Sequence, residues 1–290
     1  PTGALTPAFM QSETRTIHAA LIAALPEAQR SRIAAIPLDI TSEMIEPNAA
    51  AACTRSTKRA VMLITTAMLT LCGGIAETRA YDELASTNTY DRYARQVVDQ
   101  LRSKRPVTGV PPTLVAGPLA RDPRKLARER QLFQEQVAFI LAHELAHHHR
   151  GHTSCVGSGD ASRADAEELA RIASGTVPMF TQPLEVESDT WAVYNVMAAG
   201  NGRAGGSWDE EGGLMNLEFF ARLREIGGAS ILSAFFSTPP LPPIRRPLNE
   251  KAARPWAPGR RPPRAPGGTE GLPIPGGGTL PIQIPGLTSP

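Results

Sequence analysis

The sequence predicts an α+β fold that is mostly helical and has one small sheet. Several segments space their apolar residues three and four positions apart, as helices do when one face is buried. Two short runs near the N-terminus have the length and apolar content of buried strands. At 290 residues, with 41% apolar and 20% charged residues, the chain is long enough for one substantial domain with a real core.

The N-terminal part is expected to form two helices followed by strands. Ser12 can cap the first helix, and Pro26 stops it. Gly73-Gly74 is expected to form a turn after the second strand. The expected elements are helices over 12–25 and 27–35 and strands over 38–45 and 59–65.

A long helix has the clearest local signals. Asp122 offers an acceptor side chain at the cap, and Pro123 lacks an N–H that the first turn does not need. No breaker follows before Gly151, which ends the helix after Arg150. The other expected segments are a helix over 81–101, an irregular connection over 105–118, and helices over 183–199 and 209–226.

The composition changes after Phe236, where proline becomes frequent. We expect a covering strap to about Pro247 and a disordered tail from about Ala252. The chain therefore divides into one domain over 1–250 and a tail rich in proline, glycine and arginine over 251–290.

Charge and cysteine content argue against several classes of protein. The net charge is only +2, aromatic residues make up 5%, and no basic stripe is interleaved with aromatics, so we expect no nucleic-acid partner. The three cysteines form no CxxC pair, so they suggest neither a thiolate zinc knuckle nor a thioredoxin-type site. We expect buried thiols, with a Cys53–Cys155 disulfide as the alternative in an oxidising compartment.

An apolar run over 60–76, AVMLITTAMLTLCGGIA, follows two basic residues and mimics a targeting segment. Its position inside the chain and its threonines favour a buried strand at Val61–Ile64. A membrane-embedded segment over 60–76 is the alternative.

Five of the six histidines lie between positions 143 and 152, around the motif HELAH. His143 and His147 stand four apart on the long helix and project from nearly the same face, so both imidazoles can reach one metal ion. Glu144 can then take a proton from a metal-bound water without binding the metal itself. A catalytic zinc site also needs a third protein ligand and an open position.

The segment QPLEVESDTWAV offers that ligand, because Glu185 and Asp189 share one face of an expected helix. Glu185 can complete the metal site while Asp189 accepts the free ring N–H of a ligand histidine. Glu187 is expected to point to the opposite side, into solvent.

A rival pairing of His148 with His152 is disfavoured. Gly151 interrupts the helix between them, and no acid follows His148. We interpret His148 and His149 as surface residues or supports of the ligands, and His152 either as such a support or as an ordinary loop residue. His18 is expected to be structural or exposed.

With these motifs, the chain resembles the gluzincin metallopeptidases of the HtpX and CAAX-prenyl-protease type, including their soluble periplasmic and lipoprotein relatives. The matching segments occur in order over about residues 12–250. They are PNAAAAC (47–53), RAVMLITTAML (59–69), AFILAHELAHHHRGH (138–152), LEVESDTWAV (184–193) and FSTPPLPPIRRP (236–247).

The resemblance implies a zincin-like metallopeptidase domain with a small sheet beside the HExxH helix. It implies strand 60–65 as the edge on which a peptide substrate pairs, with Asn48 shaping that edge rather than touching the metal. It assigns His143, His147 and Glu185 as ligands of one Zn²⁺ per chain, Glu144 as general base, and Asp189 as a support of the ligands.

The chain departs from the family in three places. Pro239 stands where the family has a histidine, which puts in doubt a role for that imidazole, and Ser188 replaces the usual alanine. A long insertion over about 76–122 is expected to form either a lid or an enlarged helical layer.

These observations predict a zinc-dependent endopeptidase, in protein quality control, in which Glu144 activates the water and passes its proton to the leaving amine. Arg245, Tyr194 and His152 are candidates for contacts with the oxyanion or the substrate. The alternative is a catalytically silent zinc-binding or chaperone-like module.

The expected partners are peptides or unfolded proteins, with peripheral membrane association as an option. The absence of a starting methionine, the alternative disulfide and the resemblance favour an extracytoplasmic location, in the periplasm or cell envelope, over the cytoplasm.

Overall fold

The computed structural model describes most of the first 153 residues and several segments beyond them. The described residues are 4–42, 46–54, 58–153, 155, 182–201, 203, 208–228, 242–254, 272–273 and 279–280. Statements about the fold and its contacts below concern these residues.

The fold is α+β and mostly helical, as the sequence predicts. The described helices are α1 (Pro7–Ala24), α2 (Glu27–Ile33), α3 (Thr66–Ala85), α4 (Thr89–Arg102), α5 (Pro123–His149), α7 (Gln182–Gly200), α8 (Glu211–Gly227) and α10 (Pro242–Ala253), with a short 3₁₀ helix η1 (Pro118–Arg121). The described strands are β1 (Leu38–Thr41), β2 (Ala49–Cys53), β3 (Ala60–Thr65), β4 (Leu272–Pro273) and β5 (Thr279–Leu280).

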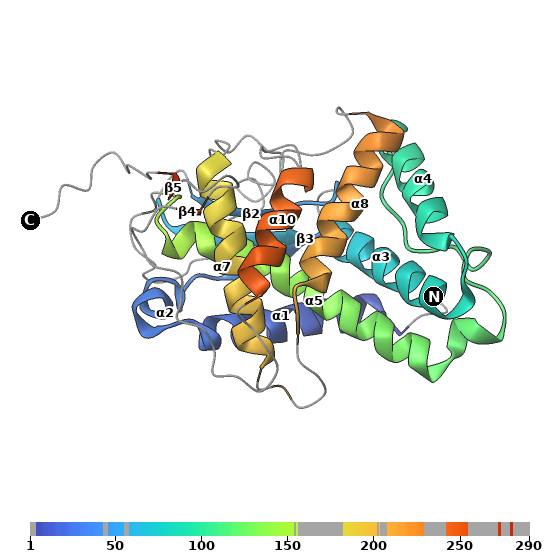
Figure 1. Ribbon diagram of the computed structural model, residues 1–290, viewed down its shortest axis with the longest axis horizontal. Coiled ribbons are helices and arrows are strands. Elements are labelled where there is room, and N and C mark those ends of the chain that lie inside the picture. The colour runs from blue at the N-terminus through green and yellow to red at the C-terminus, as the bar shows by residue number, and fades with distance from the viewer. Residues whose placement is uncertain are drawn as a thin grey trace, which may run out of the picture.

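Helix α5 is the element around which the others pack. It contacts α7, α3, α8 and α1, and in Figure 1 it runs through the middle of the molecule with α7, α10 and α8 crossing it. The side chain of Asp122 caps it by accepting the N–H of Arg124, and Gly151, at φ 80°, follows its end. The expected start and end of this helix are confirmed.

Strand β3 is central in the small sheet, and this corrects an expectation. The strand order is β1-β3-β2, with β1 parallel and β2 antiparallel to β3. All six residues of β3 are buried, which suits a strand paired on both sides better than an edge. The expectation that strand 60–65 lies at the edge of the sheet is therefore wrong. The edge strand on the antiparallel side is β2.

Helix α1 begins earlier than predicted. It starts at Pro7, and Thr6 rather than Ser12 caps it by accepting the N–H of Phe9. The signal is an acceptor side chain followed by proline, the same as at the start of α5.

Gly73 and Gly74 lie inside α3 instead of in a turn. Thr65 caps α3 by accepting the N–H of Met68, so the helix follows β3 directly. A Cβ on Gly74 would overlap the phenol ring of Tyr93 on α4, so glycine is needed there for close approach of the two helices. The expected helix over 81–101 is the end of α3 and then α4, with a break at 86–88 where Ser86 adopts φ 51°.

The expected strap up to Pro247 is also wrong in part. Residues 242–247 belong to α10, while 237–241 lie outside the described residues. Pro242 and Pro243 fall in the first turn, where a missing N–H breaks no hydrogen bond, although Pro247 lies inside the helix. Beyond residue 254, the expected tail is described only at β4 and β5, which form a two-stranded antiparallel pair.

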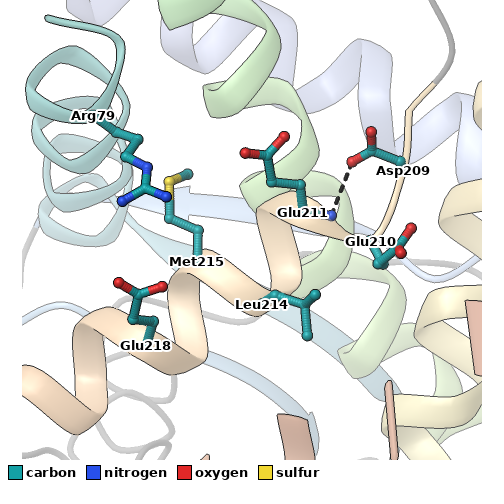
Figure 2. Close-up of a pocket in the computed structure, with 7 residues that line it drawn as sticks. All are labelled: Arg79, Asp209, Glu210, Glu211, Leu214, Met215 and Glu218. Atoms are coloured by element: carbon teal, nitrogen blue, oxygen red, sulfur yellow. Dashed lines mark hydrogen bonds between the residues drawn. The ribbon is translucent and has the colours of Figure 1, made fainter. Parts of the chain in front are cut away.

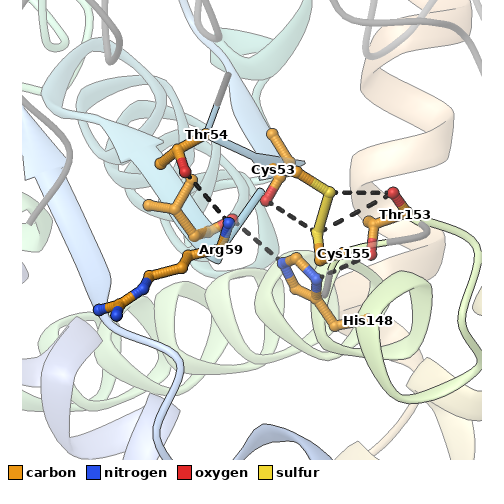
Figure 3. Close-up of a disulfide and its surroundings, with 8 residues drawn as sticks. Cys53, Thr54, Arg59, His148, Thr153 and Cys155 are labelled. Atoms are coloured by element: carbon orange, nitrogen blue, oxygen red, sulfur yellow. Dashed lines mark hydrogen bonds between the residues drawn. A yellow bond between two sulfur atoms is a disulfide. The ribbon is translucent and has the colours of Figure 1, made fainter. Parts of the chain in front are cut away.

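The insertion forms a helical layer rather than a lid in its described part, because α4 packs on α3 and α8. Cys53 and Cys155 form a disulfide that ties the end of β2 to the segment after α5 (Figure 3). Cys72 is a buried thiol, and burial raises its pKa to about 12. None of the described helices has the length and apolar character needed to span a membrane, and the run 60–76 is divided between β3 and α3.

We expect Gly74→Ala to lower the free energy of unfolding by roughly 1–3 kcal/mol, because overpacking against Tyr93 outweighs the better helix propensity of alanine. Gly109→Ala is the control, since a Cβ there meets nothing within 4 Å. Urea unfolding of the two variants measures the difference. Equal stability of the two variants would contradict the close contact between α3 and α4.

Candidate metal centre

The C-terminal half of α5 presents two histidines on one buried face. His143 and His147 are 2% and 1% exposed, and their Nε2 atoms lie 3.1 Å apart. The four-residue spacing stacks them one turn apart, as the sequence predicts. Two imidazole nitrogens therefore converge on one point.

Helix α7 packs against α5 and brings Glu185 to the same point. Its Oε2 lies 3.4 Å from Nε2 of His143, and its Oε1 lies 3.6 Å from Nε2 of His147. His143, His147 and Glu185 are called the ligand group below. All three are buried, and they could hold a metal ion.

Asp189 and Arg245 support His143. Nδ1 of His143 lies 2.9 Å from Oδ1 of Asp189, one turn after Glu185 on α7. Arg245 on α10 donates from two nitrogens to Asp189, at 2.7 and 2.6 Å. Burial opposes ionisation of Asp189, but Arg245 and His143 outweigh it and hold the pKa of Asp189 at about 2. The carboxylate can then fix the proton of His143 on Nδ1 and leave Nε2 free for a metal.

A second chain of contacts supports His147. Its Nδ1 lies 3.0 Å from Nδ1 of His152, whose Nε2 lies 3.2 Å from Glu187. Arg150 donates to the other oxygen of Glu187 at 2.6 Å, and Ser188 lies 3.3 Å from Nδ1 of both histidines. With a metal on Nε2 of His147, its Nδ1–H donates to His152, which in turn donates to Glu187.

The end of α5 explains how His152 reaches this place. Gly151 adopts φ 80°, and the N–H of His152 donates to the carbonyl of His147 at 2.8 Å. This is the hydrogen bonding of a helix closed by a left-handed residue. The chain therefore turns back under His147 directly after the helix.

Glu144 faces the sheet. Its Oε2 accepts the N–H of Ala51 at 2.6 Å, and the residue is 2% exposed. Burial, with a smaller contribution from Glu185, raises its pKa to about 7. A carboxyl group with this pKa can both accept and return a proton near neutral pH.

Strand β2 turns backbone groups toward Glu144. Asn48 pairs with Thr65 and Thr54 pairs with Arg59, so the even-numbered residues of β2 face β3. The N–H and C=O groups of residues 49, 51 and 53 therefore point to the other side. The backbone of Asn48 thus pairs β2 with β3, whereas the resemblance implied that Asn48 shapes strand 60–65 as an edge.

Several residues do not lie where the sequence suggested. Glu187 was expected in solvent, but it is 7% exposed, because the end of α5 covers that side of α7 with Arg150 and His152. His148 and His149 are buried rather than on the surface. His148 bonds to the carbonyl of Val61 on β3 at 3.0 Å and to Thr153 (Figure 3), and His149 packs on Trp191.

The three candidates for an oxyanion contact have different surroundings. Arg245 is bound to Asp189, and His152 lies behind His147. Tyr194 follows Glu185 by nine residues, which places it on the opposite face of α7, where its ring packs on Trp191. The structure therefore brings His152 and Arg245 to the supports of the ligand group but not Tyr194.

We expect His152→Ala to weaken divalent metal binding by the ligand group roughly 10–100-fold, because Nδ1 of His147 loses an oriented acceptor. Competition with a chromophoric chelator measures the affinity. His18→Ala on α1 is the control, since Nε2 of His18 has no hydrogen-bond partner in the described structure. An unchanged affinity in His152→Ala would show that Ser188 alone orients His147.

No family model, curated protein or solved structure matches this chain.

Proposed function

We propose that the chain is a zinc-dependent endopeptidase of the gluzincin type. The observation that carries the proposal is the spacing of the ligand group. Two ligands held tetrahedrally at the usual zinc distances lie about 3.3 Å apart. The three separations here are 3.1, 3.4 and 3.6 Å.

The donor set supports zinc over other ions. Two imidazoles and one carboxylate suit zinc, whereas calcium and magnesium prefer oxygen ligands alone. Three protein ligands leave a fourth position, as in catalytic rather than structural zinc sites. A zinc ion bound there supplies Lewis acidity toward a peptide carbonyl and toward water.

Glu144 is suited to the proton transfers. It is adjacent to a ligand but is not itself in the ligand group, so its carboxylate stays available to take a proton from water and deliver it to the leaving amine. A protein that only stores or senses metal needs no such carboxylate beside the ligands.

The backbone of strand β2 supports the proposal that the substrate is a peptide. An extended peptide could pair with the outward N–H and C=O groups of residues 49 and 53 and with the C=O of Ala51, whose N–H donates to Glu144. Ala51 bonds to Glu144, so a peptide on this strand would pass beside the carboxylate. The alanines of β2 would present little steric hindrance to it.

The proposal also covers the substrates and the cellular location. Substrates are peptides or unfolded proteins, consistent with a role in quality control. The Cys53–Cys155 disulfide favours an oxidising compartment, and thus an extracytoplasmic location.

We expect Glu144→Gln to retain zinc and to lower cleavage of casein by a factor of about 10²–10⁴, because the general base is lost. Zinc content per chain and the cleavage rate are measured on the same preparation. Glu225→Gln, at an exposed glutamate on α8, is the control. Equal cleavage by Glu144→Gln and wild type would contradict the proposed role, and no cleavage by wild type with zinc bound would favour the zinc-binding or chaperone-like module.

We expect Glu185→Gln to weaken zinc binding, because an amide is a poorer ligand than a carboxylate. The loss should exceed the roughly 10–100-fold that is typical when a residue that only orients a ligand is removed. A zinc chelator should abolish cleavage by the wild type, and added zinc should restore it. Glu218→Gln on α8 is the control for zinc affinity. Wild-type affinity in Glu185→Gln would exclude Glu185 as the third ligand.

A further inference from the structure

A second group of acids lies on α5, away from the ligand group. Glu135 on α5, Asp209 just before α8 and Glu211 at its start each place one carboxylate oxygen within 4.8 Å of the others. They are called the α8 carboxylates below. Glu135 precedes His143 by eight residues, about 12 Å along the helix. The two groups are therefore separate.

Among the α8 carboxylates, Glu135 gives the strongest evidence that the group binds a ligand. Its side chain is 0% exposed, and Gln131 donates to its Oε1 at 3.0 Å. Its Oε2 is buried and has no hydrogen-bond partner in the described structure. A buried carboxylate oxygen without a partner is costly, and a bound cation would offset that cost.

In Asp209 and in Glu211, one carboxylate oxygen likewise accepts a hydrogen bond. Oδ1 of Asp209 accepts the N–H of Glu211 at 2.9 Å (Figure 2), and Oε2 of Glu211 accepts from Arg128 at 2.6 Å. Within the described residues, no protein donor reaches Oδ2 of Asp209 or Oε1 of Glu211. One oxygen from each of three carboxylates thus remains available.

Gly212 brings the three acids together. A Cβ at this position would overlap the backbone and the Cβ of Glu135, so only glycine lets the first turn of α8 approach α5 this closely. The adjacent Glu211 and the nearby Asp209 are held beside Glu135 as a result. The arrangement is set by helix packing rather than by flexible side chains alone.

The donor chemistry selects a hard cation. Three carboxylate oxygens without nitrogen or sulfur suit calcium or magnesium. Calcium commonly takes several protein carboxylates, whereas magnesium keeps several waters and is usually held by one or two, so three carboxylates whose oxygens lie within 4.8 Å of one another favour calcium. Asp209 and Glu211 also line a cavity of about 230 Å³ (Figure 2), from which water can complete the coordination.

We propose that Glu135, Asp209 and Glu211 bind a Ca²⁺ ion that fastens the start of α8 to α5. The ion would stabilise the helix that carries the ligand group without contacting that group. The proposal does not depend on peptidase activity.

The test uses the full chain, stripped of metals and resupplied with one equivalent of zinc. Calorimetric titration with CaCl₂ should show about one strong site per chain, and calcium at about 100 times the Kd should raise the Tm by several degrees. Glu135→Gln and Asp209→Asn should each weaken calcium binding roughly tenfold or more, because the site loses a charged ligand.

Glu210→Gln is the matched control. Glu210 lies between Asp209 and Glu211 in the chain and lines the same cavity, but it is outside the α8 carboxylates (Figure 2). Wild-type calcium binding in Glu210→Gln, with loss in Glu135→Gln, supports the proposal. It is overturned if calcium does not raise the wild-type Tm, if Glu135→Gln keeps the full rise, or if magnesium produces the same rise in every variant.

Discussion

The packing of α7 against α5 is the contact on which the ligand group depends, because it brings a carboxylate to two imidazoles. Six charged side chains lie buried or nearly buried around it: Glu144, Glu185, Glu187, Asp189, Arg150 and Arg245. Four carboxylates against two guanidiniums leave two negative charges, which a divalent ion would balance. Without metal, a proton fills part of this role, since hydrogen bonds with Asp189 and Glu185 outweigh burial and raise the pKa of His143 to about 10.

Helices with strong local signals were predictable, and features that depend on a distant partner were not. The acceptor and proline at Asp122-Pro123 gave the start of α5, and the apolar run of β3 gave a buried strand. Glycine, however, marks both turns and close helix contacts, and only the position of Tyr93 shows which applies at Gly74. The strand order could not be predicted either. The alanines of β2 have low strand propensity, so this segment forms a strand through its pairing with β3.

The ligand group could be predicted because its geometry is local to two helices. A spacing of four residues fixes the relative directions of His143 and His147, and likewise of Glu185 and Asp189. The support of His147 could not be found this way, since His152 lies beyond the helix and reaches it only through the turn at Gly151. The burial of Glu187 follows from that same turn, which lays Arg150 and His152 over it.

Buried polar residues recur along α5, and several of them contact other segments of the chain. Lys125 pairs with Glu77 of α3, Glu129 accepts the N–H of Ala4, and His143 contacts Asp189 of α7. An apolar ridge can exchange one contact for another, but a shift of one turn, about 5.4 Å, would separate these pairs, and a buried charge that loses its partner costs several kcal/mol. Lys125 would keep Glu129, its partner on the same helix. We infer that these pairs fix how each helix is set against α5. Ligands that arrive from two helices need such a constraint, because a shift of one turn exceeds any metal–ligand bond.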